Sequence, residues 1–439
     1  MRVSIVVPVW NGASVVPDCL EAVYAHSGDE LLEVVCVDNA SYDESAALIA
    51  DRYPHARLIW QPVNLGFAGG VNAGIDAAQG DVFVLLNQDC IVQPGWLAEL
   101  LRALEVHSEF GIAGCTIVNS DGTLNHAGAF VRRPDAYGVH STEIGDGEPR
   151  PVEYVTGAAM AIRRSTWDRI GRFDEGFYPA YYEDSDYCYR ARRKGLETGL
   201  VPSARVTHLL SSREWQRDPI KHAANQHFAR YRFVCKHFDS AETTAFFGAE
   251  EAAAQAERYF DQALGRVIAT RDILRNLDDV LARRSDDLGD DLPQAHRRQL
   301  RVGFTQVLQR SFSVAEAMGV SHPLVSPLES SADWQACRQR LELLRQREYD
   351  LLTRIYFTPR SSDQSERLIR RLFRLLMQRP LSLLTGREHL LLADLNTVHV
   401  ARMDEIETMD SISRQYLSQL SQLSRRARVL EILTEYDYR

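Results

Sequence analysis

Residues 3–12 read VSIVVPVWNG, a short apolar run rich in β-branched residues that ends in a turn-forming Asn-Gly pair. Such a run predicts a buried strand. Similar runs follow at 31–38 (LLEVVCVD), 56–61 (ARLIWQ) and 81–89 (DVFVLLNQD), and helices are expected between them at about 14–26, 43–53 and 66–80. Continuous apolar strands alternating with helices are typical of a mostly parallel sheet covered on both faces. The first part of the chain is therefore predicted to be an α/β domain.

Polar residues gather where three of these strands end. The clusters read VWNG, VDNAS and LNQDC, and each directly follows an apolar run. In open α/β sheets, ligands bind at the carboxyl ends of the strands. The sequence thus predicts one ligand site that these three clusters share.

Composition limits the classes of protein that the chain can belong to. Its 439 residues are 45% hydrophobic and 25% charged, and the net charge of −10 argues against nucleic acid as the main partner. Residues 1–238 carry 22 Lys and Arg against 30 Asp and Glu, whereas the remainder carries 28 against 30, so the acidity lies in the first part, where a metal site is sought.

The cysteines and the hydropathy pattern point to a compartment. Seven cysteines without a C-x-x-C pair fit a reducing environment. The apolar run near the N-terminus is too short for a signal peptide and is interrupted by Pro8, and no run approaches the length of a spanning helix. We therefore expect a cytoplasmic protein.

The second part of the chain has a different, helical character. An apolar face recurs at helical spacing through 250–284, and residues 285–294 and 321–331 interrupt the pattern. We expect an α/β domain at 1–240 and an all-α domain at 241–439, used for assembly or for docking to an acceptor or a membrane.

Two segments of the expected helical domain suggest a role in assembly or docking. From Ile406 to Leu430 apolar residues follow a 3-4 spacing that suits a coiled coil or a bundle helix equally. Residues 366–380 form a basic amphipathic helix that suits an anionic membrane surface or packing within the bundle.

The motifs at the strand ends are ambiguous one by one. Asp38 and Asn39 suit hydrogen bonds to a base or ribose, or a helix cap. The glycines of NLGFAGGVNAGI (64–75) suit close approach to phosphate, or tight packing. Asn87 and Asp89 suit a divalent cation, or a plain turn.

A further stretch, FYPAYYEDSDYCYRARRKG (177–195), sets three acids after a run of aromatic residues. Acids at a helix start favour the positive end of the helix dipole. Of the three, Asp186 is expected to cap the helix or to pair with Arg190, four residues on.

Taken together, these motifs resemble glycosyltransferase family 2, which has the GT-A fold. VSIVVPVWNG, VDNASYD, NLGFAGGVNAGI and LLNQDC occur in the family's order and spacing, and VTGAAMAIRR, YYEDSDYCYRARRKG and VPSARVTHL continue the likeness to about residue 238. The chain looks most like the bacterial rhamnosyl- and galactofuranosyltransferase-like branch. The metal motif, often D-x-D in the family, is N-x-D here.

The resemblance implies a role for each matching residue. Asp184 would be the base that deprotonates the acceptor hydroxyl, and Asp89 and His208 would bind a divalent metal, Mg²⁺ or Mn²⁺. Acceptor-binding residues would be Glu183, Tyr182 and Gly157. Nucleotide-binding residues would be Pro8, Val9, Trp10, Asn11, Asp38, Asn39, Asn64, Gly66, Phe67, Asn72 and Asn87.

The implied reaction is inverting, metal-assisted transfer of a sugar from a UDP- or dTDP-linked donor, and rhamnose is one candidate sugar. The acceptor would be a hydroxyl of a glycan or lipid-linked saccharide in bacterial surface polysaccharide synthesis. The chain would form a homo-oligomer through its C-terminal helices and contact the inner face of the cell membrane peripherally. Two alternatives are a non-catalytic sugar- or nucleotide-binding scaffold and a sugar nucleotidyltransferase. The latter usually carries a glycine- and basic-rich loop after its first strand, whereas VPVWNGAS has one glycine and no basic residue.

Overall fold

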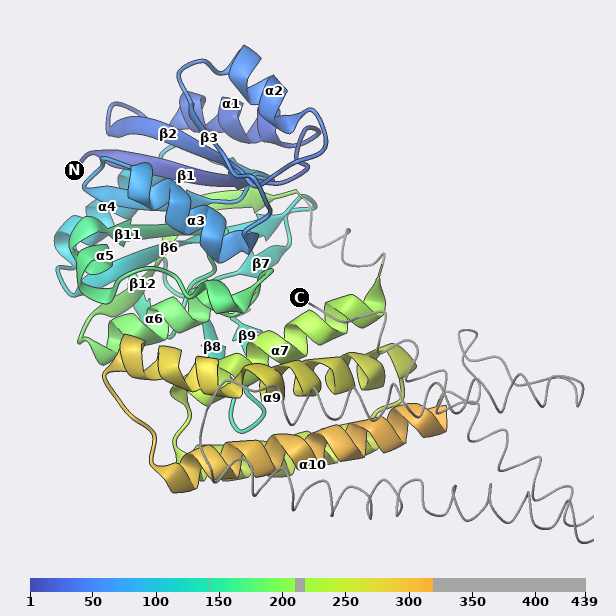
Figure 1. Ribbon diagram of the computed structural model, residues 1–439. Helices are drawn as coiled ribbons and strands as arrows, with labels where there is room; N and C mark the ends of the chain where they lie inside the picture. The colour runs from blue at the N-terminus through green and yellow to red at the C-terminus, as the bar shows by residue number, and fades with distance from the viewer. Residues whose placement is uncertain (142, 210–217, 319–439) are drawn as a thin grey trace, which may run out of the picture. The chain divides into compact units, whose positions relative to one another are not determined.

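The computed structural model describes residues 1–141, 143–209 and 218–318 (Figure 1). The amphipathic helix expected at 366–380 and the coiled coil expected from Ile406 to Leu430 lie outside these residues.

A mixed sheet of ten strands forms the centre of the fold, in the order β10-β12-β6-β11-β4-β1-β2-β3, with β5 paired to β12 and β7 to β6. Its strands are β1 (Val3–Val9), β2 (Leu31–Asp38), β3 (Arg57–Trp60), β4 (Val82–Leu86), β5 (Cys90–Val92), β6 (Phe110–Asn119), β7 (Leu124–His126), β10 (Arg150–Val152), β11 (Ala159–Arg163) and β12 (Glu197–His208). A separate hairpin consists of β8 (Ala129–Val131) and β9 (Gly138–His140).

Strand direction follows the prediction in the first half of the chain. The pairs β1–β2, β1–β4, β2–β3 and β6–β12 are parallel. Strand β11 runs antiparallel to both neighbours, β4 and β6. Because of this reversal, the residues just before β11 lie at the edge where β4 ends.

Helices cover both faces of the sheet (Figure 1). The helices of the described residues are α1 (Val16–His26), α2 (Ser45–Arg52), α3 (Gly66–Ala77), α4 (Trp96–Val106), α5 (Arg164–Ile170), the short 3-10 helix η1 (Glu175–Phe177), α6 (Glu183–Arg193), α7 (Pro219–His237), α8 (Ser240–Ala256), α9 (Phe260–Leu288) and α10 (Gln294–Met318), of which the earlier ones cover the sheet. Local signals define several of their starts. For example, Asp239 and Glu242 form a reciprocal capping box at the start of α8.

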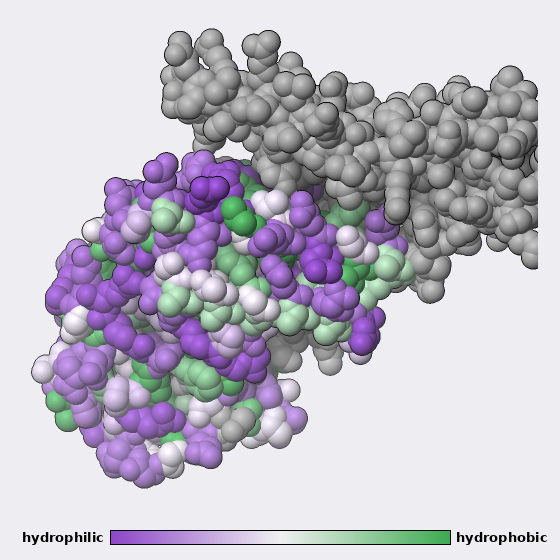
Figure 2. Space-filling view, turned by 90° about the horizontal axis from the view of Figure 1, so that it is seen from below, coloured by the Kyte–Doolittle hydropathy of each residue, from purple (hydrophilic) through white to green (hydrophobic). Residues whose placement is uncertain are grey.

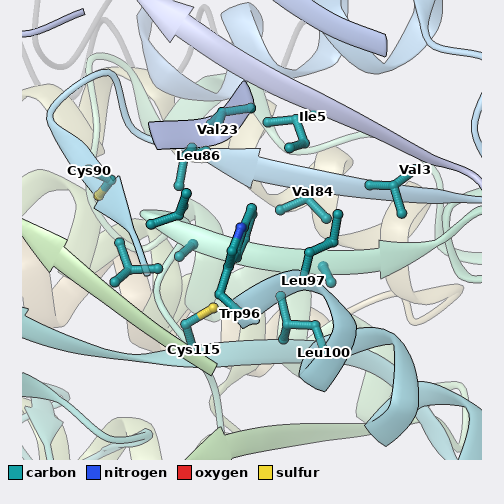
Figure 3. Packing of buried hydrophobic residues seen from close by; sticks show 14 of the residues in the cluster. Val3, Ile5, Val23, Val84, Leu86, Cys90, Trp96, Leu97, Leu100 and Cys115 are labelled. Carbon is teal, nitrogen blue, oxygen red and sulfur yellow. The ribbon is translucent and has the colours of Figure 1, made fainter. Parts of the chain in front are cut away.

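Successive residues of each strand point to opposite faces, so the two faces have separate cores. Side chains of α1 and α4 pack with Ile5, Val84 and Leu86 on one face (Figure 3). On the other face, α3 approaches so closely that a Cβ on Gly74 would stand 2.3 Å from the Val6 side chain. The six cysteines in the described residues are free and buried, as expected of small hydrophobic side chains.

Most of the described residues after 240 belong to the same compact unit as the α/β part. Residues 1–257 and 265–311 form that unit, and residues 258–264 and 312–318 belong to a second. The division into functional domains at residue 240 stays a prediction.

Two features concern contact with a membrane: the hydropathy of the surface and the apolar length of the helices. On the face seen in Figure 2, hydrophilic side chains predominate and hydrophobic ones are scattered among them. Within 1–141, 143–209 and 218–318, no helix has the length and apolar character needed to cross a bilayer.

The core makes a direct prediction about stability. Leu100 on α4 is fully buried, whereas Val106 on the same helix is 67% exposed. Leu100→Ala should lower the free energy of unfolding by about 2–5 kcal/mol, because it leaves a cavity. Val106→Ala, the matched control, should change it by less than about 0.5 kcal/mol. Urea unfolding of both variants checks this, and equal effects would contradict the assigned packing.

Candidate functional site

The loops after β1 and β4 are joined by hydrogen bonds through Gln88. Its side chain accepts from the Trp10 backbone N–H at 3.0 Å and donates to the Trp10 carbonyl at 3.0 Å. Asn11 is tied to the loop after β2, since its side chain accepts the Tyr42 backbone N–H at 3.0 Å. The predicted convergence of the three strand ends is therefore present in the fold.

Asn39 and Asn64 hold the turn that begins α3. The Asn39 side chain accepts the Leu65 backbone N–H at 2.9 Å and donates to the Gly66 carbonyl at 2.8 Å. Asn64 accepts the Gly66 N–H at 2.8 Å. Gly66 has a φ of +71°, and a Cβ there would stand 2.8 Å from the Pro179 carbonyl, so only glycine fits.

Two of the expected nucleotide contacts, Asn72 and Val9, have structural surroundings instead, and a third, Asp38, is nearly buried. Asn72 is fully buried, and its amide donates to the Phe173 carbonyl and to Glu175 while its oxygen accepts the Phe173 N–H. The Val9 side chain is also fully buried, and Asp38 is 2% exposed. Asn72 and Val9 hold the fold together, and we no longer expect their side chains to touch a nucleotide.

Aromatic side chains lie open at this edge of the sheet. Trp10 is 38% exposed and Tyr42 is 80% exposed, and their rings meet edge to face with centroids 6.3 Å apart. Neither Tyr42 nor Gln88 was foreseen from the sequence, because each becomes part of the edge only through contact with the loop after β1. Pro8 is half-buried beside them.

Asp89 and His208 come together as the metal prediction requires. The Asp89 Oδ1 and His208 Nε2 atoms lie 3.1 Å apart, and both side chains remain partly exposed. Antiparallel pairing of β5 with β12 sets His208 opposite Cys90, which brings it beside Asp89. Carboxylate oxygen and imidazole nitrogen are both suitable ligands for a divalent cation.

The Cys90 thiol also lies near this pair. Cys90 is fully buried, and burial followed by the negative charge of Asp89 raises its pKa well above the usual value. Thiolate sulfur selects softer metals than Mg²⁺ or Mn²⁺, whereas carboxylate oxygen suits both, so Asp89 with His208 is the pair that fits such a metal.

A two-residue segment before β11 links this pair to the expected base. The Ala158 carbonyl accepts the Asn87 backbone N–H at 3.0 Å, and the Gly157 N–H donates to Asp184 Oδ2 at 3.1 Å. Gly157 packs tightly here, because a Cβ would stand 2.9 Å from the Phe67 ring and would require the ring or the segment to shift. Asn87, Gly157, Phe67 and Asp184 are thus brought to one place.

Asp184 sits in the first turn of α6 and is half-buried. Burial raises its pKa above the usual aspartate value, against the opposing effect of hydrogen bonds from the Gly157 and Ser185 backbone N–H groups. A carboxylate with a raised pKa is a stronger base than an ordinary aspartate.

Glu183, its neighbour, is only 6% exposed, and its Oε2 atom has no hydrogen-bond partner. Burial, followed by the charge of Asp184, raises its pKa well above the usual glutamate value. The Glu183 carboxyl therefore holds its proton more readily than an ordinary glutamate does.

The aromatic residues before α6 form a strained turn. Tyr181 and Tyr182 both have positive φ, 84° and 65°, a conformation that non-glycine residues rarely adopt. The Tyr182 hydroxyl donates to the Ala136 carbonyl at 2.7 Å and accepts the Gly138 N–H at 3.2 Å. The hydroxyl of Tyr182, expected to bind acceptor, is thus engaged by the β8–β9 hairpin.

His126 and His140 are further titratable groups on this side that the sequence did not reveal. Their rings meet at 4.7 Å, and buried His126 accepts the Thr156 backbone N–H, one residue before the Gly157 N–H that reaches Asp184. Burial, followed by the charge of His140, lowers the pKa of His126 to about 3, so it is neutral.

Comparison with known proteins identifies the family. Residues 4–170 match the model described as "Glycosyl transferase family 2". An N-acetylglucosaminyl-diphospho-decaprenol L-rhamnosyltransferase of Mycobacterium tuberculosis is 30% identical over 230 residues, which cover 46% of this chain and 74% of that protein. The chain belongs to glycosyltransferase family 2.

Other matches of this glycosyltransferase are more partial. The O-antigen biosynthesis protein RfbC of Myxococcus xanthus is 28% identical over 224 residues, 47% of this chain and 17% of that protein. Among solved structures, GalNAc-T7 with UDP, GalNAc and Mn²⁺ aligns at a TM-score of 0.49 and 18% identity, over 58% of this chain and 51% of that one. That last likeness is too distant to bear on function.

Gly157 gives a test of the geometry in this glycosyltransferase. Gly157→Ala should push the segment off the Phe67 ring and disturb its hydrogen bond to Asp184, which lowers the transfer rate by roughly 10-fold or more. The matched control is Gly248→Ala, since a Cβ at this helical position meets nothing within 4 Å. Initial rates at equal concentrations of folded protein check this, and equal rates would refute the assigned contact.

Proposed function

We propose that the protein is an inverting glycosyltransferase that uses a nucleoside-diphosphate sugar and a divalent metal, with Asp184 as its base. The observation that carries this proposal is that Asp184 and Asn87 both hydrogen-bond to the segment 157–158. Asp89, two residues after Asn87, lies beside His208. A base for the acceptor and a metal site for the leaving diphosphate then flank one position for the donor sugar.

The base acts on the acceptor side. An acceptor hydroxyl oxygen attacks the anomeric carbon from the face opposite the nucleotide, while its proton passes to Asp184 and the bond from the anomeric carbon to the diphosphate breaks. The configuration at that carbon inverts. A carboxylate is needed because a sugar hydroxyl is a weak nucleophile until its proton is removed. The buried Glu183 and the aromatic turn before α6 would limit water at this place.

Asp89 and His208 would hold the metal on the leaving-group side, with Asn87 beside them. When bound, a divalent cation supplies positive charge that stabilises the departing diphosphate. The nucleotide would lie along the ends of β1 and β2. The partly exposed ring of Trp10 would pack there against the nucleobase. Asn11, Asn39, Asn64, Gly66 and Phe67 shape the surrounding loops.

We propose UDP or dTDP as the nucleotide, and rhamnose is a candidate sugar because a rhamnosyltransferase is among the relatives. A glycan or lipid-linked saccharide of the bacterial surface is the proposed acceptor. Homo-oligomer formation and peripheral contact with the inner membrane face are proposed for the C-terminal helices. The scaffold alternative is disfavoured because Asp89, His208 and Asp184 are all present and suitably disposed.

Calorimetric titration tests the donor and metal assignments together. UDP, dTDP, GDP and ADP are each titrated with and without Mn²⁺ into wild type, Asp89→Ala and the control Asp168→Ala, an exposed acid on α5. UDP or dTDP should bind more tightly with Mn²⁺, and Asp89→Ala alone should lose that gain, because it removes the carboxylate ligand. Metal-independent binding would overturn the metal site, and no binding at all would favour the scaffold.

Substitution of the base tests the mechanism. Asp184→Asn should bind nucleotide normally yet lose transfer by at least about 100-fold, since an amide cannot accept the proton. Asp18→Asn, an exposed first-turn acid of α1, is the control. In wild type, transfer should fall as the pH drops through the raised pKa of Asp184, above the ordinary value of about 3.9. Full activity in Asp184→Asn would exclude the assignment.

A further inference from the structure

A buried cluster of charges behind the catalytic helix has no part in the proposed chemistry. Carboxylates of Asp174, Asp186 and Asp287 converge on the Lys236 ammonium, at distances of 2.8, 2.8 and 2.6 Å from its Nζ atom. They come from three elements, since Asp174 precedes η1, Asp186 is on α6 and Asp287 is on α9. Lys236, on α7, is fully buried.

Arginines and a histidine satisfy the remaining carboxylate oxygens. Arg190 contacts Asp186 at 2.9 Å, Arg232 holds both oxygens of Asp174, and Arg283 contacts Asp287 at 3.1 Å. His237 lies 2.8 Å from Asp186, and burial lowers its pKa to about 4, so it is a neutral hydrogen-bond donor. The three carboxylates could in principle hold a metal ion, but the Lys236 ammonium group already takes that place.

The choice of lysine at this point is informative. Of the 50 lysines and arginines, only Lys194, Lys221 and Lys236 are lysine, so the chain uses arginine for nearly every other cation. An ammonium group has three N–H donors directed around one centre, whereas the guanidinium of arginine is a flat fork. Three carboxylates arriving from three elements match the first shape and not the second.

The position of Asp186 connects this cluster to the base. Asp184 and Asp186 are two residues apart in the first turn of α6, so their side chains are rotated by about 200° around the helix axis. Asp184 therefore points to the segment 157–158 while Asp186 points into the cluster. Any rotation of α6 that frees Asp186 also displaces Asp184.

Helix α7 also contacts the β8–β9 hairpin, which lies beside α6. Arg230, six residues before Lys236, donates to the Asp135 carbonyl at 2.6 Å and lies 4.2 Å from the Tyr137 ring centroid, both between β8 and β9. The Tyr182 hydroxyl holds the same turn through Ala136. One helix thus contacts both the catalytic helix and the hairpin beside it.

We propose that Lys236 is a positioning residue for transfer, which fixes the rotation of α6 and thereby the place of Asp184. This proposal rests on the proposed role of Asp184 as base. The nucleotide loops follow β1, β2, β3 and β4, and none of them supplies a carboxylate to Lys236. Disturbing the cluster should therefore affect turnover and leave nucleotide affinity intact.

The test uses the full chain and the variant Lys236→Met, with Lys194→Met, an exposed lysine just after α6, as its matched control. Turnover by Lys236→Met should fall by about 10- to 100-fold per folded molecule, the usual effect of a base displaced by about 1 Å. The UDP or dTDP dissociation constant should change by less than about twofold. Hydrogen exchange in 183–188 should be faster. Lys194→Met should match wild type in all three measurements.

Loss of folding in Lys236→Met is a real prospect, because it leaves buried carboxylates without their cation. The variant Asp287→Asn then tests the proposal, since it keeps a hydrogen-bond acceptor for Lys236 but removes one negative charge. We expect its turnover to fall by about 3- to 10-fold, with nucleotide affinity unchanged. Wild-type turnover in either folded variant would overturn the proposal. Faster exchange in 183–188 reports the loosening of α6 even if Asp184 is not the base, which separates this proposal from the proposed function.

Discussion

The reversed direction of β11 is the constraint on which the site depends. Because β11 runs antiparallel to β4, its first residues lie where β4 ends, and segment 157–158 meets Asn87 there. The same segment gives its Gly157 N–H to Asp184. A parallel β11 would begin at the opposite edge of the sheet, and segment 157–158 would then lie a full strand length from Asn87. One strand direction therefore brings together groups that are almost 100 residues apart in the chain.

The three acids in the first turn of α6 differ in the direction of their pKa shifts, because each side chain faces different neighbouring groups. Glu183 and Asp184 lose water without gaining a cation, which raises the pKa of both. Burial would also raise the pKa of Asp186, yet the charges of Lys236 and Arg190 outweigh burial and hold it well below the usual value. The helix dipole favours all three acids alike, so the neighbours from η1, α7 and α9 make the difference. A tightly held ion pair on one side of α6 thus coexists with the proposed base, Asp184, on the other.

Much of the site was predictable because its signals are local. Apolar runs that end in polar residues defined β1, β2 and β4, and the pairing of Asp186 with Arg190 followed from helical spacing. Predictions that depended on side-chain direction were less successful. Asn72 and Val9 are buried, and the Tyr182 hydroxyl is engaged by the hairpin, since a motif does not state which way a side chain points. Gln88 and the His126–His140 pair gave no signal because their partners are distant in the chain.

The sequence by itself determined the strand–helix alternation, the location of the polar clusters at strand ends and the family, since each depends on residue type and spacing along the chain. Only the tertiary structure decided that β11 is reversed, that His208 meets Asp89 through pairing of β12 with β5, and that Lys236 gathers three carboxylates. Those contacts join residues from separate elements. They form because buried charges and backbone groups must find partners within the packed chain, whichever element supplies them.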